Sequence, residues 1–156
     1  MLHVFQGEGN ALELLTYAVR QVWGFEKLPE ISRLPDGKPF FMRYPDCHFN
    51  LSHSGEIVLC ALSDQPVGVD VECICPRREG FPEYVFKGSD YERYQALGGD
   101  WAAFYTLWTE VESIIKYTGE GLKAWRRART PEDCVITNLI GDGWRGAVCA
   151  HETASS

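Results

Sequence analysis

In residues 67–72 of the chain, valine alternates strictly with glycine or an acidic residue. Successive side chains of a β-strand point to opposite faces, so this pattern predicts a strand with one apolar face and one acidic face. A second apolar run, residues 56–62, lies just before it, and Gln65-Pro66 between them suits a tight connection. The sequence therefore predicts that the two strands form a hairpin. The apolar face of the later strand carries Val67, Val69 and Val71. Its other face carries Gly68, Asp70 and Glu72.

Helical periodicity appears in three other segments. Residues 11–23 repeat apolar side chains at helical spacing after Asn10, a suitable N-cap. Residues 89–97 form a shorter candidate, with Ser89 as the expected cap. The longest candidate follows Asp100 and runs to about residue 117. Residues 134–140 and 144–150 read as a final hairpin. Helices and strands mix without regular alternation, which favours the α+β class.

Size and charge restrict the classes of function. A chain of 156 residues fits one domain or two small packed lobes. Its net charge of −7 argues against nucleic-acid binding, which needs clustered Lys and Arg. No window reaches the ~18 apolar residues of a membrane span, and the polar N-terminus does not resemble a signal peptide. We therefore expect a cytoplasmic protein.

The six cysteines are expected to be reduced thiols in that compartment. They are scattered, and the one close pair, Cys73 and Cys75, does not have the usual zinc spacing. Cys60 and Cys149 lie in strand-like runs, where a thiol commonly serves as a small core side chain. A zinc site is therefore not predicted.

Asp70 and Glu72 lie two residues apart on the acidic face of the predicted strand, so their side chains project the same way, about 7 Å apart. Two carboxylates in this arrangement repel each other unless a cation lies between them, and Mg²⁺ prefers oxygen ligands. The alternative is an ordinary solvent-facing strand edge, because such a pair is common. Spacing alone favours the ordinary edge.

Glu112 and Lys116 lie four residues apart on the long predicted helix. One interpretation is a third metal carboxylate with a lysine one turn away, ready for a phosphate. The other is a surface ion pair, which would stabilise the helix by only ~0.3–0.5 kcal/mol. Spacing leaves both open.

Residues 49–55 gather hydroxyls, an imidazole and backbone N–H groups just before a strand. Such a turn can hold a phosphate, although a polar turn that caps the strand would look the same. A serine hydrolase is disfavoured, because Ser52 lies outside a G-x-S-x-G elbow and an adjacent His53 would not face it in an extended segment.

Taken together, these segments resemble the three ordered motifs of the 4′-phosphopantetheinyl transferases, in particular the Sfp-type class that activates peptide and polyketide synthetases. The motifs are Phe49-Asn50-Leu51-Ser52-His53-Ser54, Val67-Gly68-Val69-Asp70-Val71-Glu72 and Trp108-Thr109-Glu110-Val111-Glu112-Ser113-Ile114-Ile115-Lys116. Gly37-Lys38-Pro39 and Gly119-Glu120-Gly121-Leu122 also resemble that class. Each motif alone is weak, whereas all of them in order are specific.

The resemblance implies a pseudo-dimer of two small α+β lobes, approximately residues 1–64 and 65–156 within one domain, with coenzyme A between them and with the first lobe shortened. It implies transfer of the 4′-phosphopantetheine arm of coenzyme A to a serine of an apo acyl or peptidyl carrier protein, releasing 3′,5′-ADP.

The resemblance also implies roles for particular residues. Asp70, Glu72 and Glu112 would hold Mg²⁺. Glu112, directly or through a metal-bound water, would take the proton of the carrier serine. Lys38, Ser52 and His53 would contact the nucleotide and its phosphates, and Lys116 would contact the pyrophosphate and the departing 3′,5′-ADP.

Departures from the family pattern keep other functions open. Val111 stands where the family usually has lysine, the first lobe is expected to begin at its helix without preceding strands, and little chain follows Leu122. A non-catalytic relative that binds coenzyme A or a carrier protein is one alternative. A metal-dependent phosphohydrolase, with water as the nucleophile, is another.

Overall fold

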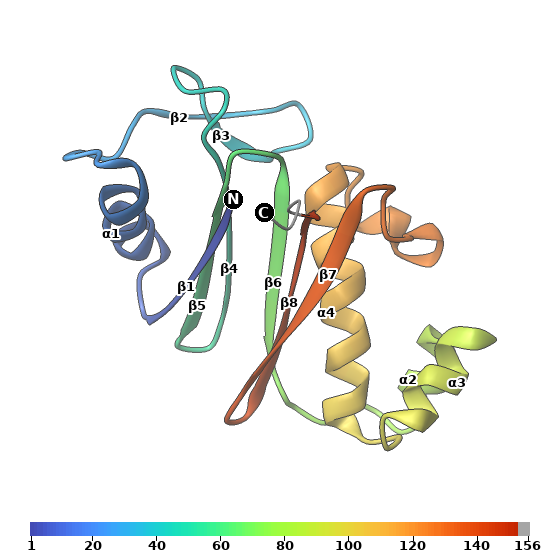
Figure 1. Cartoon of the computed structure of the whole chain (residues 1–156). Coiled ribbons are helices and arrows are strands. Elements are labelled where there is room, and N and C mark those ends of the chain that lie inside the picture. The colour runs from blue at the N-terminus through green and yellow to red at the C-terminus, as the bar shows by residue number, and fades with distance from the viewer. Residues whose placement is uncertain (153–156) are drawn as a thin grey trace.

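The computed structural model describes residues 1–152, and its two halves have the same connectivity (Figure 1). Each half contains a strand, then a helix, then an antiparallel hairpin whose second strand pairs with the first strand, giving the sheet orders β1-β5-β4 and β6-β8-β7. The first half comprises β1 (Leu2–Glu8), α1 (Ala11–Trp23), β4 (His48–Ser54) and β5 (Ile57–Ser63). The second comprises β6 (Val67–Cys73), α4 (Trp101–Thr118), β7 (Cys134–Gly141) and β8 (Trp144–His151).

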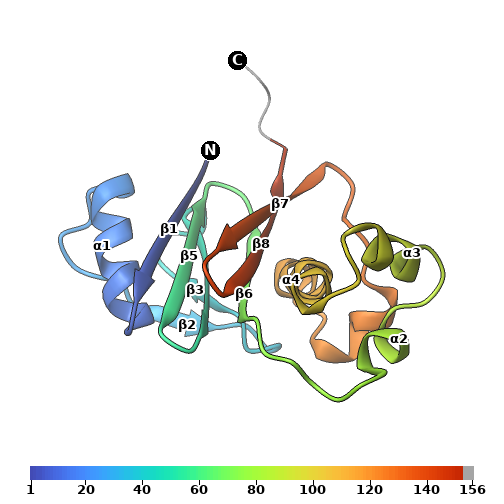
Figure 2. The same cartoon turned by 90° about the horizontal axis from the view of Figure 1, so that it is seen from below.

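Smaller elements extend each half. A two-stranded ribbon joins α1 to β4, and short helices surround α4 on the side away from the first half (Figure 2). These elements are β2 (Ile31–Arg33), β3 (Pro39–Phe41), α2 (Phe81–Val85), α3 (Ser89–Ala96) and the 3₁₀ helix η1 (Leu122–Arg127). The α+β class expected from the sequence is confirmed.

The two main helices begin and end at the residues that the sequence predicts. Asn10 Oδ1 accepts a hydrogen bond from Glu13 N at 3.1 Å, and Asp100 Oδ1 accepts one from Ala103 N at 2.8 Å. At the C-terminus of α4, Gly119 adopts φ 75°, a left-handed conformation that glycine adopts without a Cβ penalty. Both long helices are therefore set by local sequence.

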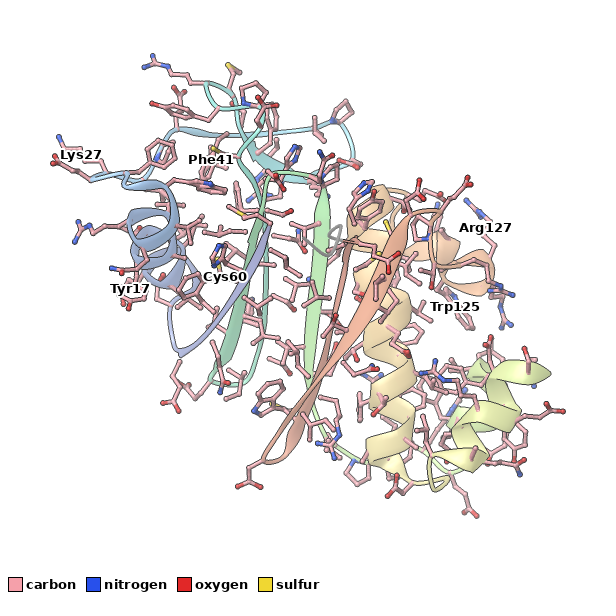
Figure 3. All side chains as sticks on the ribbon, viewed as in Figure 1. Tyr17, Lys27, Phe41, Cys60, Trp125 and Arg127 are labelled. Atoms are coloured by element: carbon pink, nitrogen blue, oxygen red, sulfur yellow. The ribbon has the colours of Figure 1, made fainter. Side chains whose placement is uncertain are left out.

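The core has three layers of apolar contacts. The valine face of β6 packs with β8 against Leu59 and Ala61 of β5, between the two sheets. The second layer lies between α1 and the outer face of the first sheet, where Figure 3 labels Phe41 and Cys60. The third packs α4 against α2 and α3 through aromatic rings. Cys60 and Cys149 are fully buried, as expected.

The predicted hairpin between residues 56–62 and 67–72 is wrong. β5 pairs with β1 and β4, whereas β6 pairs with β8, and the two strands belong to different sheets. Val67, Val69 and Val71 face the first sheet across the core instead of pairing with it. Adjacent apolar strands can pack face to face as readily as they pair, and the pattern alone does not separate the two arrangements.

The N-terminal segment also differs from the expectation. A full strand, β1, precedes α1 and pairs with β5 from Leu2↔Ser63 to Glu8↔Ile57. The expectation that the first half begins at its helix is therefore wrong. Ser89 is not the cap of α3 either, because the N-cap position is Gly88 and no side chain caps that helix. No helix within residues 1–152 is long and apolar enough to cross a membrane.

Candidate active site

The acidic face of β6 lies directly against α4. A Cβ added at Gly68 would collide with Ser113 O and Tyr117 N, so the helix backbone rests on the strand at this point. Glycine here permits an approach that another residue would block. The close contact brings Asp70 and Glu72, further along β6, beside Glu112 and Lys116 of α4.

Asp70 is the central group of this cluster and is only 3% exposed. Its Oδ1 accepts a hydrogen bond from Ser52 Oγ at 3.1 Å and lies 3.6 Å from Lys116 Nζ. Its other oxygen, Oδ2, is buried without a hydrogen-bond partner. The pKa of Asp70 is raised to about 7, chiefly by burial. Lys116 and the hydrogen bond from Ser52 oppose this rise in pKa, and the charges of Glu112 and Glu72 contribute to it.

The two glutamates share this environment. Burial raises the pKa of Glu112, with Lys116 opposing and Glu72 adding to the rise. Burial also raises the pKa of Glu72, with Arg77 and Lys116 opposing. Three carboxyl groups whose pKa values all rise through burial are poorly compensated within the protein, a pattern typical of functional sites.

Lys116 does not behave as a simple surface partner of Glu112. Its Nζ donates to Leu51 O of β4 at 3.3 Å and forms its ion pair with Asp70 of β6. The side chain therefore spans from α4 to both sheets and places a positive charge next to the carboxylates.

A pocket of about 260 Å³ opens beside Lys116. We call it the lysine pocket, because Lys38 and Lys116 both line it. The β2–β3 turn, strand β4 and the C-terminal end of α4 form its walls, so it receives residues from both halves. Its lining consists of Asp36, Gly37, Lys38, Pro39, Asn50, Leu51, Ile115, Lys116, Gly119 and Gly121.

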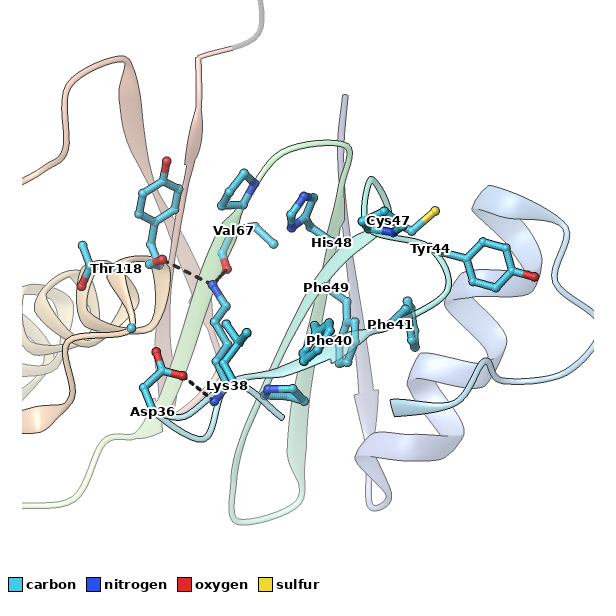
Figure 4. Close-up of a pocket in the computed structure, with 16 residues that line it drawn as sticks. Asp36, Lys38, Phe40, Phe41, Tyr44, Cys47, His48, Phe49, Val67 and Thr118 are labelled. Carbon is cyan, nitrogen blue, oxygen red and sulfur yellow. Dashed lines mark hydrogen bonds between the residues drawn. The ribbon is translucent and has the colours of Figure 1, made fainter. Parts of the chain in front are cut away.

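Lys38 also borders a second pocket of about 290 Å³, the aromatic pocket, shown in Figure 4. Its Nζ donates to Val67 O at 3.2 Å and Tyr117 O at 3.4 Å, so two of its three N–H donors are used within the protein. Burial lowers the pKa of Lys38, with Asp36 opposing. The aromatic rings of the pocket include Phe40, Phe41, Tyr44, Phe49 and Tyr117.

The predicted turn at residues 49–55 is mostly strand β4, and its residues separate by face. Ser52 is 6% exposed, and its single hydroxyl hydrogen is directed at Asp70. His53 is exposed on the opposite face and lines neither the lysine pocket nor the aromatic pocket. The structure thus brings Ser52 to the carboxylates and does not bring His53 there.

The oxygen atoms around Asp70 are of the type that a hard divalent cation prefers, but they do not form a ready-made metal site. Asp70 Oδ2 is a buried oxygen without a partner, and the neighbouring groups are carboxylates, the ligands that Mg²⁺ prefers. Within residues 1–152, however, no three His, Cys, Asp or Glu side chains are gathered tightly enough to form a ready metal site. Substrate phosphate oxygens commonly supply the remaining ligands of Mg²⁺.

Val111 lies on a different side of α4. It lines a cavity of about 140 Å³ together with Trp125 and Arg129, near the ion pair between Arg93 and Glu110 at 2.7 Å. The valine therefore faces the cavity beside η1 and does not line the lysine pocket.

Asn50 and Ser54 belong to the site region but were not singled out from the sequence. Asn50 Oδ1 accepts from Val69 N at 2.8 Å, and Ser54 Oγ accepts from Cys73 N at 2.9 Å. The available signal was the spacing of Asn50, Ser52 and Ser54 at every second position, which places the three polar side chains on one strand face.

Comparisons with known proteins agree with this arrangement. Residues 66–146 match the model of the 4′-phosphopantetheinyl transferase superfamily. A 4′-phosphopantetheinyl transferase of Bacillus subtilis is 40% identical over 109 residues, which are 69% of this chain and 46% of the relative. The transferase psf-1 of Bacillus pumilus is 34% identical over 140 residues, 78% of this chain and 60% of the relative. The transferase Sfp of Bacillus subtilis (strain 168) is 41% identical over 109 residues, 69% of this chain and 46% of the relative.

The α+β fold thus places a buried carboxylate, two partly buried glutamates and a lysine where its two sheets meet. The chain belongs to the 4′-phosphopantetheinyl transferase superfamily, and its relatives include Sfp, as the sequence motifs predict. It spans about half the length of the curated relatives that it matches.

Proposed function

We propose that the chain transfers the 4′-phosphopantetheine arm of coenzyme A to a serine of an apo carrier protein. The observation that carries this proposal is the cluster of Asp70, Glu72 and Glu112 with Lys116, beside a pocket with a second lysine. A phosphoryl-transfer reaction needs compensation of negative charge and a group that accepts a proton. Both are present at the junction of β6 and α4.

The lysine pocket suits the nucleotide end of coenzyme A. Its two lysines can compensate phosphate charge, and its walls come from backbone segments at Gly37 and Gly119 that permit close approach. We propose that Lys38 and Lys116 contact the phosphates. The predicted contacts of Ser52 and His53 with the nucleotide have less support, because Ser52 already donates to Asp70 and neither residue lines the lysine pocket.

The carboxylates would hold Mg²⁺ through Asp70, Glu72 and Glu112, and the ion, when bound, would neutralise charge on the pyrophosphate. Glu112, directly or through a metal-bound water, would accept the proton from the carrier serine hydroxyl. The serine oxygen forms a bond to the phosphorus that bears pantetheine, and the bond from that phosphorus to the leaving oxygen of 3′,5′-ADP breaks. Lys116 offsets the charge that develops on the leaving group.

We further propose that the two halves are the two lobes of a pseudo-dimer, residues 1–64 and 65–156. The shared connectivity of the two halves supports this proposal, and the short connection between β5 and β6 is compatible with a boundary near residue 64. The proposed site uses β4 and the β2–β3 turn from the first lobe and β6 and α4 from the second. The acyl or peptidyl nature of the carrier protein stays open, and the cytoplasmic location stays a prediction.

A non-catalytic relative that binds coenzyme A or a carrier protein is the second candidate. It is favoured by Val111, which removes a lysine expected in the third motif and instead lines the cavity beside Trp125. The cluster of Asp70, Glu72 and Glu112 with Lys116 weighs against it, because a relative without catalysis has no physical need for three converging carboxylates.

The test is incubation of the protein with coenzyme A, MgCl₂ and an apo carrier protein, followed by intact-mass measurement of the carrier and chromatography of the nucleotide. Transfer adds the arm to the carrier and releases 3′,5′-ADP. Hydrolysis consumes coenzyme A and leaves the carrier unchanged, as the phosphohydrolase alternative requires. If calorimetry detects binding while neither product forms, the non-catalytic candidate replaces the proposal.

A further inference from the structure

Strand β4 holds strand β6 through side chains instead of through backbone pairing. β6 is an edge strand of its sheet, so its outer N–H groups need partners. Three alternate side chains of β4 supply them. The bonds run from Val69 N to Asn50 Oδ1 at 2.8 Å, from Val71 N to Ser52 Oγ at 3.1 Å, and from Cys73 N to Ser54 Oγ at 2.9 Å. We call this set the β4 ladder.

Ser52 differs from Ser54 in one additional bond. Besides accepting from Val71 N, its hydroxyl donates to Asp70 Oδ1 at 3.1 Å. A serine hydroxyl has one hydrogen, so this donor is fully committed to Asp70. Ser54 Oγ accepts from Cys73 N in the same way, but no bond to a carboxylate accompanies it.

The bond from Ser52 fixes which oxygen of Asp70 is available. Oδ1 receives the hydroxyl of Ser52 and faces Lys116, whereas Oδ2 stays without a partner. Rotation of the carboxylate would take Oδ1 away from Ser52. Hydrogen bonds to the second oxygen of a ligating carboxylate orient such ligands, and their loss typically weakens metal binding 10–100-fold.

We propose that Ser52 is a positioning residue that holds the Asp70 carboxylate with Oδ2 directed at the cation used in the reaction. The proposal rests on the proposed function, because it assigns Ser52 a role at that same site. It gives Ser52 a task other than the nucleotide contact predicted from the sequence. Ser52 acts through Asp70 and does not itself touch the reacting atoms.

The test compares Ser52→Ala with Ser54→Ala. Each variant removes one acceptor of the β4 ladder, so both are expected to lower the melting temperature, and only Ser52→Ala also releases Asp70. Calorimetric titration of coenzyme A at a series of MgCl₂ concentrations gives the Mg²⁺ concentration for half-maximal enhancement of binding. We expect Ser52→Ala to raise that concentration about tenfold or more, and Ser54→Ala to leave it within about twofold of wild type, the small effect expected away from metal-orienting bonds.

Ser52→Thr keeps the hydroxyl and is expected to restore the wild-type Mg²⁺ dependence. If Ser52→Ala does not fold, Ser52→Cys, which keeps the volume but weakens the bond to Asp70, replaces it in the comparison. Equal Mg²⁺ dependence in the Ser52 and Ser54 variants, in a wild-type protein that transfers the arm, overturns the role of Ser52 and leaves the proposed function intact. Binding of coenzyme A to wild type that does not respond to Mg²⁺, with no transfer, overturns both.

Discussion

Asp70 is buried at 3% exposure with one oxygen bonded and the other unpartnered. A buried carboxylate without full compensation destabilises the fold. Such a group persists where a ligand compensates it, and strained or unsatisfied groups concentrate at functional sites. At this residue, stability and the proposed function therefore oppose each other.

Replacement of Asp70 by Asn tests this opposition. We expect Asp70→Asn to raise the melting temperature by a few degrees in the absence of divalent cations, because a neutral amide is less costly to bury than a carboxylate. The same variant is expected to lose the Mg²⁺-dependent part of coenzyme A binding. Thermal melts and calorimetry with and without MgCl₂ measure the two effects. A lower melting temperature would show that burial of this carboxylate does not destabilise the fold, and an unchanged response to Mg²⁺ would remove Asp70 from the cation site.

Glu112→Gln addresses the proton acceptor. The amide keeps the size of the side chain and cannot take a proton at neutral pH, so we expect a transfer rate lower by ~10²–10⁴-fold. Because Glu112 is also a proposed cation ligand, we expect the Mg²⁺-dependent part of coenzyme A binding to fall as well. The rate is measured under single-turnover conditions.

Glu110→Gln is the matched control for that variant. It makes the same change on the same helix, at a carboxylate that pairs with Arg93 at 2.7 Å on the side of α4 near η1. We expect a modest loss of stability and a transfer rate within a few-fold of wild type. Equal losses of rate in the two variants would mean that the defect comes from the helix and not from the base.

Asp70, Glu72, Glu112 and Lys116 could be predicted as site residues from the sequence, because residue types and the order of the motifs can be read there directly. The structure brings them into one cluster. The interaction between Ser52 and Asp70 was not predictable, because it depends on how β4 and β6 are aligned across two sheets. The roles of these residues stay predictions until the variants are measured.

At the scale of elements, β4 shows why polar strands are difficult to predict. Asn50, Ser52 and Ser54 have low strand propensity or are typical of turns, and the segment reads as a loop. In the folded chain these side chains bond the edge of β6, which stabilises an otherwise unfavourable strand. The helices α1 and α4 were predictable because their caps and apolar periodicity are local.

The contact of α4 with β6 depends on Gly68. A methyl group there would collide with the backbone of residues 113 and 117, which cannot move as a side chain can. We expect Gly68→Ala to destabilise the protein by at least ~2 kcal/mol, or to lower the melting temperature by roughly 5 °C or more, and to weaken coenzyme A binding because α4 carries Glu112 and Lys116.

Gly7→Ala is the control for this substitution. Gly7 is also in a strand, but an added Cβ would meet only the Leu14 side chain, with Cδ1 at 3.1 Å. We expect a change within ~1 kcal/mol, because a flexible side chain can give way. Calorimetric melts of the pair measure the difference, and equal stabilities would show that the α4–β6 approach is not constrained by Gly68.

At the scale of the whole molecule, the candidate site lies where the two halves meet. Asp70 on β6 receives bonds or charge from β4 and α4, and the lysine pocket draws its walls from the β2–β3 turn, β4 and α4. The class of fold and most elements could be predicted from local patterns. The pairing of β6 with β8, over 70 residues away in sequence, could not, because strand partners are chosen by packing across the whole chain.

The proposed reaction is transfer of the phosphopantetheine arm at the site where β4, β6 and α4 meet. Single-turnover transfer to an apo carrier protein, followed by intact mass in the presence and absence of MgCl₂, tests it most directly. We expect the wild-type protein to give the modified carrier in a Mg²⁺-dependent reaction, with one 3′,5′-ADP released for each carrier modified. A wild-type protein that is folded and binds coenzyme A but leaves the carrier mass unchanged at every Mg²⁺ concentration would contradict it.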